Sequence, residues 1–528
     1  MPVNHWIWTG PPGAALTDRA LFWEPDQTPG LWIVPSKRAR DQWTRELART
    51  RPEAIEETVW SWDDLWQAVL ARSEGGPIVL SAAGARAALL EAIARARAQR
   101  EPEVEVLGDL VETSGFRRRI GQRIAAWTLA ERPLDSPPAP LDRVLAAEWI
   151  IYGHYLAILG ELGAVDEAGL APWASRALRD RPIPELKRAK RIVVADLTRA
   201  LPATWRVLNR LRRLRSCSVL LTLPYESGSA RTEVFADSAR IRDRLLAWGF
   251  QEEALKPPED RPEGLRSVEA KLFRDDVPTS RTLRSTEGLT LRGAPRGEGI
   301  ARVLAEAIRD RLKGGEPPEE ILVLFRTWDE EAELVYETLR TWGLPVSAEP
   351  PRPLKAEPTV LALRLAMGLP VEDWDADRLA RLLRNGQLGL RNDRGKPWSA
   401  LDLATAASAI RETRVFRGQQ AIGEALARMS NAEAEAGASG PDYLRRQKQR
   451  RARRARLALP IFGRLVAAFE PLRRPAPWPV QVDALAGLAD QLGLGSPDDP
   501  ALGHLFNALE DHGAVLEGLG PGRLPRTL

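Results

Sequence analysis

The chain has 528 residues, of which 44% are hydrophobic and 28% are charged, and its mean hydropathy is -0.30. This composition can bury a large core, so it excludes wholesale disorder and a fibrous fold. One cysteine, Cys217, and four histidines exclude a disulfide framework, a cysteine-rich zinc site and a four-thiolate iron-sulfur cluster within the chain. We therefore expect no metal site and no bound cofactor.

Charge and hydropathy also bear on location. Lys and Arg number 76 and Asp and Glu number 72, so the net charge is +4 and the placement of cations matters more than their sum. No apolar run is long enough to span a bilayer, and the first residues lack the basic start and apolar core of a signal peptide. The sequence predicts a cytoplasmic protein.

The first 35 residues are typical of the start of an α/β layer. Apolar residues predict strands at 5–8 and 31–34, with a helix at 14–21 between them. A Gly/Pro loop, Gly10-Pro11-Pro12-Gly13, separates the first strand from this helix.

The α/β pattern is then interrupted and returns. Spacing of apolar residues predicts a helix at 59–70 and mostly helical structure over 81–186. A strand, a helix and a strand follow within 191–223. We expect a first α/β domain formed by residues 1–80 and 187–285, with a helical insertion at 81–186.

Polar segments before residue 285 predict a domain boundary there. After it, short apolar runs at 289–291, 321–325 and 344–346 alternate with amphipathic helical segments, which predicts a second α/β domain over 286–370. The rest of the chain, 371–528, is helical in pattern, and its abrupt end favours a truncated helical domain.

The loop after the first strand lies where a phosphate-binding loop would be. Such a loop needs glycines whose backbone N–H groups wrap the phosphates, a lysine for the β and γ oxygens, and a Ser or Thr for Mg²⁺. Gly10 and Thr17 fit the motif and Gly13 lies within the loop, but Ala15 and Leu16 stand where the second glycine and the lysine belong. We therefore expect structural use of the turn rather than ATP binding.

The second half of an ATPase site would be a strand that ends in two acids. Residues 193–198 supply the first, Asp196, and put Leu197 where the second should stand. The alternative interpretation is a buried strand-end carboxylate that caps the next helix.

The order of these segments resembles the AddB/RexB family, which supplies one of the two subunits of the AddAB-type ATP-dependent helicase-nuclease and is related to superfamily 1 helicases. The resemblance covers residues 1 to about 390 and is most specific in its last pieces. The segments that carry it are Leu31-Trp32-Ile33-Val34-Pro35-Ser36, Leu80-Ser81-Ala82-Ala83-Gly84, residues 192–198, Gly297-Glu298-Gly299-Ile300, residues 318–327, Trp342-Gly343-Leu344-Pro345-Val346 and Arg352-Pro353-Leu354.

The resemblance implies an α/β fold with two superfamily 1 helicase-like (RecA-like, P-loop-type) parallel-sheet domains and helical insertions. It implies DNA as ligand, an AddA-type helicase-nuclease subunit as heterodimer partner, and double-strand break processing for recombinational repair. By the same resemblance Arg326 would contact the γ-phosphate, but the changes at Leu16 and Leu197 leave it as a family remnant or an ion pair between domains.

The family's nuclease half, of the PD-(D/E)XK type, and its cluster cysteines are absent from this chain. Glu185-Leu186-Lys187 satisfies the bare E-x-K text, but without an adjoining acid-bearing strand we interpret it as a chance match. The sequence thus favours a non-catalytic DNA-binding subunit. Two alternatives stay open: the front half of a full-length nuclease subunit, and a free-standing structural or interaction protein.

Two basic segments are candidate DNA contacts. Lys37, Arg38 and Arg40 follow the second strand, and the densest run, at 445–456, contains Arg450, Arg451, Arg453 and Arg454 on a predicted helix. A run of this kind either faces phosphates or is a solvated helix surface, and we weigh the two equally.

Overall fold

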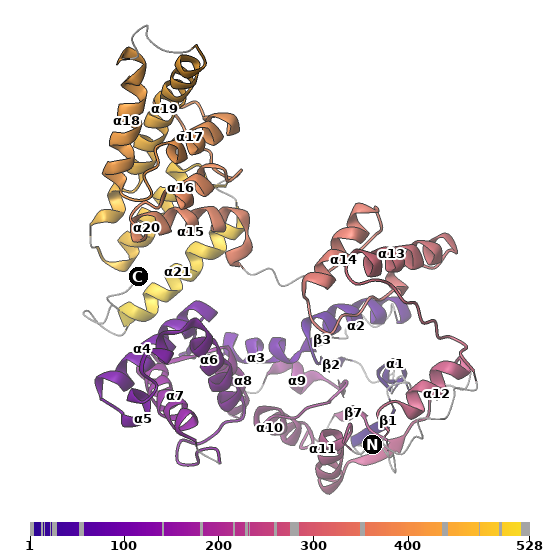
Figure 1. Cartoon of the computed structure of the whole chain (residues 1–528). Coiled ribbons are helices and arrows are strands. Elements are labelled where there is room, and N and C mark those ends of the chain that lie inside the picture. The colour runs from indigo at the N-terminus through magenta and orange to yellow at the C-terminus, as the bar shows by residue number, and fades with distance from the viewer. Residues whose placement is uncertain are drawn as a thin grey trace. The chain divides into compact units, whose positions relative to one another are not determined.

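The structure is a computed structural model of the chain, which forms two compact units. Unit 1 is Met1–Leu291 with Gly518–Leu528, and unit 2 is Arg292–Glu517 (Figure 1). The structure describes residues 5–518 apart from 12–13, 15, 22, 24–28, 52–57, 140–141, 180–182, 215–216, 227–230, 232, 258–260, 275–284, 349–353, 436–441, 475 and 496–498.

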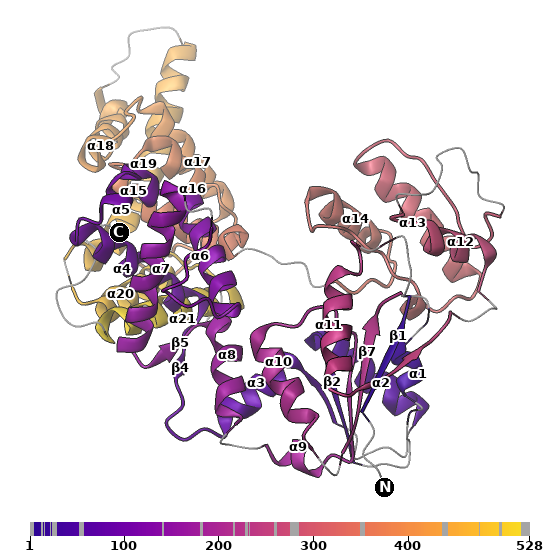
Figure 2. The same ribbon diagram turned by 90° about the horizontal axis from the view of Figure 1, so that it is seen from below.

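Unit 1 is built on a six-stranded parallel sheet with the order β3-β2-β6-β7-β1-β8. Figure 2 shows several of these strands running side by side. Because every pair is parallel, the carboxyl ends of all six strands lie at one edge. The strands are β1 (His5–Gly10), β2 (Gly30–Val34), β3 (Thr58–Ser61), β6 (Arg191–Val194), β7 (Ser218–Pro224) and β8 (Gln251–Ala254).

Helices cover both faces of the sheet, which explains why its central strands are continuous apolar runs. Side chains alternate along β2: Leu31 and Ile33 enter one core, whereas Trp32 and Val34 enter the other. The first core is covered by α3 (Trp62–Ala71), α8 (Glu167–Ala177), α9 (Pro184–Arg188), α10 (Pro202–Leu211) and α11 (Ala236–Ala247). The second is covered by α1 (Leu16–Ala20) and α2 (Lys37–Thr50).

The segment between β3 and β6 is almost entirely helical, as the sequence predicts. A two-residue parallel ladder between β4 (Ile78–Val79) and β5 (Ala164–Val165) is the addition that the sequence did not reveal. The remaining elements of unit 1 are α4 (Ala82–Ala98), α5 (Pro102–Glu105), the 3-10 helix η2 (Gly108–Glu112), α6 (Ser114–Leu129), α7 (Arg143–Glu161) and, after β8, α12 (Glu263–Lys271).

The predicted helix at 59–70 is wrong in its first turn. Residues Thr58–Ser61 pair with β2 as strand β3, and the helix begins at Trp62. Ser61 and Asp64 form a capping box, in which the Ser61 side chain accepts from the Asp64 N–H and the Asp64 carboxylate accepts from the Ser61 N–H. This reciprocal pair fixes the start of the helix.

Residues 286–346, which comprise the end of unit 1 up to Leu291 and the first part of unit 2, depart from the prediction of a second parallel sheet. The described segments 289–291, 321–325 and 344–346, predicted as strands, pair into no strand. Instead α13 (Glu298–Lys313) and α14 (Glu330–Thr341) enclose a small core, and the 3-10 helix η3 (Pro318–Glu320) between them has no buried residue. Phe325 packs against this core, whereas Leu322 and Leu324 are exposed. Half-buried and exposed side chains alternate over 321–325 as in a strand, but no neighbour among the described residues completes a ladder.

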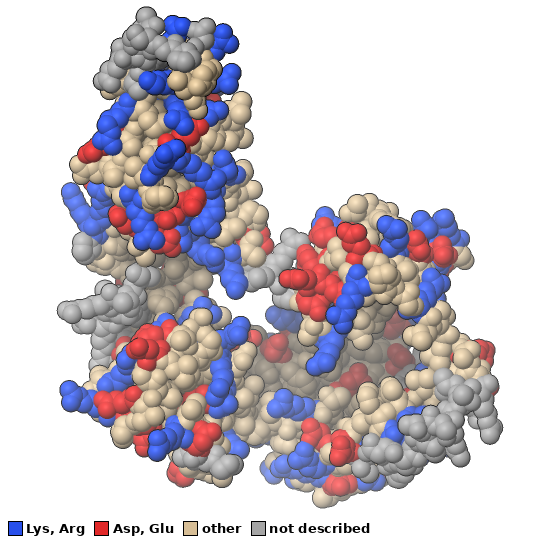
Figure 3. Space-filling model, viewed as in Figure 1, with Lys and Arg blue, Asp and Glu red and all other residues tan. Residues whose placement is uncertain are grey.

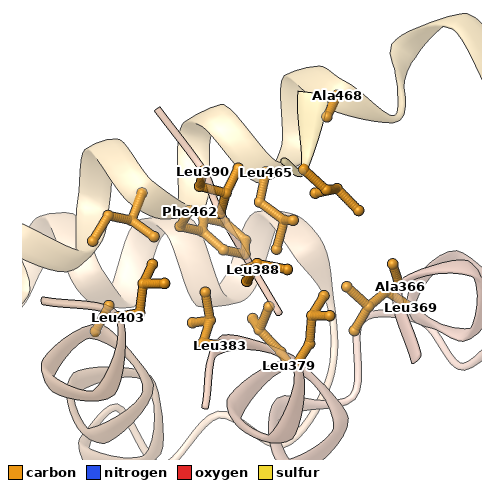
Figure 4. Packing of buried hydrophobic residues seen from close by; sticks show 14 of the residues in the cluster. Ala366, Leu369, Leu379, Leu383, Leu388, Leu390, Leu403, Phe462, Leu465 and Ala468 are labelled. Atoms are coloured by element: carbon orange, nitrogen blue, oxygen red, sulfur yellow. The ribbon is translucent and has the colours of Figure 1, made fainter. Parts of the chain in front are cut away.

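The rest of unit 2 is a helical body with one large hydrophobic core (Figure 4). Leu379 and Leu383 of α16 lie close to Phe462 and Leu465 of α19 in this core. No helix in the described ranges is long and apolar enough to cross a membrane. The elements are η4 (Leu354–Ala356), α15 (Pro358–Val371), α16 (Ala376–Leu383), α17 (Ala400–Glu412), α18 (Gln419–Glu435), α19 (Asp442–Ala468), η5 (Glu470–Arg473), α20 (Trp478–Gln491) and α21 (Pro500–Gly518).

The core of unit 2 predicts a contrast between two leucines. Leu379 is 0% exposed and Leu401 is 76% exposed. Truncating a fully buried leucine to alanine costs about 2–5 kcal/mol. We expect Leu379→Ala to lower the free energy of unfolding of unit 2 by that amount and Leu401→Ala to change it by less than about 0.5 kcal/mol. Hydrogen exchange of α16 and α19 peptides across a urea series measures both, and equal protection in the two variants would contradict the assignment of this core.

Candidate functional site

The carboxyl edge of the sheet gathers most of the predicted site residues of unit 1. Gly10 ends β1, Asp196 follows β6, and Lys37 begins α2 just after β2. This gathering follows from the topology, because parallel strands place their carboxyl ends at the same edge. Gly13 lies outside the described residues, as do Arg352 and Pro353 of the resembled segment.

A hydroxyl and a carboxylate are joined at this edge. The Thr17 hydroxyl donates to Oδ1 of Asp196 at 2.8 Å, and its oxygen lies 3.2 Å from the hydroxyl oxygen of Thr222. The Asp196 backbone N–H donates to the same Thr222 hydroxyl oxygen at 2.8 Å. Thr222 belongs to β7, which lies between β1 and β6 and so connects the two halves of the site. The sequence analysis missed Thr222, although a threonine within the apolar run of β7 was a usable signal.

Asp196 does not cap the next helix, contrary to the alternative drawn from the sequence. Helix α10 begins at Pro202, and its N-cap residue, Leu201, has no side-chain cap hydrogen bond. Asp196 instead adopts a left-handed backbone with φ of 48° and accepts from Thr17. A positive φ is uncommon outside glycine and is tolerated best by Asn and Asp.

The electrostatics of the edge disfavour an added anion. Burial raises the pKa of the Asp196 carboxyl, and the hydrogen bond from Thr17 opposes this rise only in part. Burial also raises the pKa of Asp18, with further contributions from the charges of Glu46 and Asp196. The charges of Glu46 and Asp196 thus act on Asp18, and ionised acids at this edge repel a triphosphate.

Apolar side chains occupy the positions that would hold phosphate and activate water. Leu16 and Ala14 are buried, and Leu197 is part of the sheet core. A Cβ placed on Gly10 would lie 2.8 Å from Cβ of Ala14 and 3.3 Å from Cδ2 of Leu16, so the loop is folded tightly onto the end of β1. In the described part of the chain no three His, Cys, Asp or Glu residues gather as metal ligands.

The predicted γ-phosphate residue, Arg326, lies in unit 2, whereas Thr17 and Asp196 lie in unit 1. Its side chain is exposed and follows the unpaired segment 321–325. No carboxylate among the described residues forms an ion pair with it.

Of the basic residues at the start of α2, only two are free of ion pairs within the described ranges. Arg40 donates from Nη1 to both Asp64 oxygens at 2.9 and 3.1 Å and from Nε to Asp41 at 2.9 Å. Lys37 and Arg38 are exposed beside the N-terminus of α2, where the helix dipole also favours anions. Arg40 is therefore committed to ion pairs that the sequence did not show, and Lys37 and Arg38 keep their charges toward solvent.

The four arginines of α19 are all exposed but fall into two pairs. Arg454 and Arg451 lie 2.5 and 4.0 Å from the carboxylate of Glu412 on α17. Arg450 and Arg453 have no such partner in the part of the chain that the structure describes. With Arg446 they follow the i, i+4, i+7 spacing of one helix face, and Figure 3 shows basic side chains spread over the α17–α19 region. The sequence analysis placed Arg446 in the basic run at 445–456 but missed Glu412.

Comparison with known proteins gives one distant, partial similarity and no matching family model. Over 211 residues, 36% of this chain, the sequence is 28% identical to the B-type subunit of the ATP-dependent helicase/deoxyribonuclease of Pelotomaculum thermopropionicum. The matched region spans 18% of that protein, so the chain covers much less than two thirds of its length. The findings connect the chain distantly with a DNA-repair helicase-nuclease family.

The raised pKa of Asp196 predicts how stability depends on pH. Ionising this carboxyl is less favourable in the folded protein than in the unfolded chain, so its charge lowers the free energy of unfolding above the raised pKa. This loss vanishes as pH falls through the raised pKa toward the ordinary aspartate range. Asp196→Asn, which keeps an oxygen for Thr17 and suits a positive φ, should therefore stabilise unit 1 at neutral pH.

The measurement is urea unfolding of the Asp196→Asn variant from acidic to neutral pH. The difference from the unmodified chain should shrink on acidification. Asp135→Asn, at an exposed loop position, is the charge-matched control and should show no such trend. A constant difference between Asp196→Asn and the unmodified chain would show that ionisation of Asp196 is not the cause.

The apolar loop predicts no response to nucleotide. A ligand present at 100 times its Kd adds about 2.7 kcal/mol to the free energy of unfolding, which shifts Tm by several degrees. We expect millimolar ATP with Mg²⁺ to leave the Tm within about 1 °C of its value in sodium triphosphate, the ionic control. A specific rise of several degrees would mean that Leu16 does not abolish phosphate binding.

Proposed function

We propose that this chain is a non-catalytic, helicase-like DNA-binding subunit of a helicase-nuclease complex that processes double-strand breaks for recombinational repair. Its partner in this proposal is an AddA-type helicase-nuclease subunit, and its ligand is single-stranded DNA or a duplex end. The observation that carries the proposal is the apolar filling of the nucleotide edge by Leu16 and Leu197 in a chain that is similar to an AddB-type helicase/deoxyribonuclease subunit.

In this proposal the chain does not hydrolyse ATP, because the nucleotide edge has an apolar side chain and acids where a cation is needed. A lysine at position 16 would bring a cation to the phosphates, whereas the leucine packs into the protein and brings none. Asp18 and Asp196 add negative charge at the same edge. A sheet that retains its strand-end loops but lost these groups can still position surfaces for DNA and for a partner subunit.

The DNA contact in this proposal is the exposed face of α19. Ala452 and Ala455 turn the other side of the helix toward the core, so the Arg450 and Arg453 side chains point to solvent. Two guanidinium groups one helical turn apart, with no described acid to neutralise them, present fork-shaped donors to phosphate oxygens. Arg451 and Arg454 are less available, since they lie near Glu412.

The two pairs of arginines supply a matched test. Each phosphate contact on a single strand contributes about 0.7 to the slope of log K against log salt. We expect Arg450→Gln with Arg453→Gln to flatten the slope by about 1.4 and to weaken binding of a single-stranded oligonucleotide. Arg451→Gln with Arg454→Gln removes the same charge and should change the slope less.

Fluorescence anisotropy at a series of salt concentrations gives both slopes. Equal changes of the salt slope in the two double variants would mean that only the total charge of the protein matters. No change in either variant would mean that α19 does not contact DNA. Circular dichroism melting of each variant verifies that the helical body is intact.

A further inference from the structure

The edge of the sheet opposite the candidate site is rich in cations. Helices α9, α10 and α11 precede β6, β7 and β8, so their C-terminal ends lie at the amino edge of these parallel strands. Basic residues gather in or just after these helix ends. We define the amino-edge rim as Lys187, Arg188, Lys190, Arg210, Arg213 and Arg244.

The three helix ends lie on the same face of the sheet. Leu186 of α9, Leu211 of α10 and Leu245 of α11 enter one hydrophobic core. Strands β6, β7, β1 and β8 are consecutive neighbours, so their starts span about 15 Å at the usual strand spacing. His5, the first residue of β1, lies within this span, and its Nε2 is 3.0 Å from the backbone oxygen of Arg212. The rim is thus a row supported by regular structure.

The rim has little acidic compensation. Within the described ranges Lys187, Arg188, Lys190 and Arg213 are exposed and pair with no carboxylate. The one acid of α9, Glu185, is 2.5 Å from Arg72 instead. Cations near helix C-termini stabilise the helix dipole, which accounts for part of this charge. Lys190 and Arg213 lie beyond the ends of their helices, so the dipole does not account for the whole row.

Contacts with tryptophan rings hold two arginines, Arg244 of the rim and the neighbouring Arg212. Cζ of Arg244 lies 4.3 Å from the ring centroid of Trp205 and 5.2 Å from that of Trp248. Cζ of Arg212 lies 4.9 Å from the same Trp248 ring. A guanidinium over an indole face keeps the N–H donors at the edge of its own plane available to bind oxygens. The indole faces are occupied by arginine, so they serve to position charge and not to stack on bases.

We infer that the amino-edge rim binds the phosphate backbone of single-stranded nucleic acid. Five of the six rim residues are exposed, and the rim follows strand starts that span about 15 Å. Such a row of cations, with guanidinium groups over indole rings at one end, can contact successive phosphates of one strand. This contact is separate from the arginine pair on α19 and does not depend on the helicase-nuclease assignment.

The test removes the charge of four rim residues and leaves Arg212, Arg244 and the two tryptophan rings that they contact unchanged. Lys187→Gln, Arg188→Gln, Lys190→Gln and Arg213→Gln are combined, and Arg86→Gln, Arg100→Gln, Arg132→Gln and Arg143→Gln form the matched control on exposed positions of the helical segment of unit 1. We expect the rim variant to flatten the salt slope for a single-stranded oligonucleotide by about 2–3, at about 0.7 per lost phosphate contact. The control should keep the slope of the unmodified chain.

A second variant tests the contact of Arg244 with the tryptophan rings by itself. Arg244→Lys keeps the charge but loses the planar fork, and we expect weaker binding of the oligonucleotide with little change in Tm. Equal slopes in the rim variant and the control would overturn the inference, as would a slope change seen with duplex but not with single strands. If the α19 variant alone loses binding, the rim inference fails and the proposed DNA-binding function stands; if neither variant does, both fail.

Discussion

The parallel packing of apolar strands in unit 1 is the constraint on which the rest depends. β2, β6 and β7 are buried on both faces, and they run parallel with β1 between two helical layers, as is typical of parallel sheets. That alignment separates the strand ends into two edges of different character. The carboxyl edge holds Thr17, Asp196 and Thr222 in one hydrogen-bonded group, and the amino edge holds the cations that end α9, α10 and α11.

The two edges differ in electrostatics because of a few side chains. At the carboxyl edge, burial raises the pKa values of Asp18 and Asp196, and neighbouring acids raise that of Asp18 further. The buried Leu16 stands where a phosphate-binding loop has a lysine. The described residues of this edge thus form a negative and apolar setting. At the amino edge the helix ends carry exposed cations with few acids to offset them.

Periodicity predicted much of unit 1 and less of unit 2. Strands at 5–8, 31–34 and 191–194 were predicted because fully buried parallel strands are short apolar runs. The same kind of run at 321–325 forms no strand, since a ladder requires a neighbour and none pairs with it among the described residues. A local apolar pattern indicates which side chains are buried, but it does not indicate whether a neighbouring strand is present to pair with the segment.

By itself the sequence determined the α/β character, the helical segment after β4, the loss of the phosphate lysine at Leu16 and the basic run of α19. These follow from residue type and local spacing. Only the tertiary structure decided that Arg40 and Arg454 are held by acids, that Thr222 joins Thr17 to Asp196, and that the helix ends form one row. Such contacts join residues far apart in the chain, and their existence depends on strand order and helix packing, which no local pattern encodes.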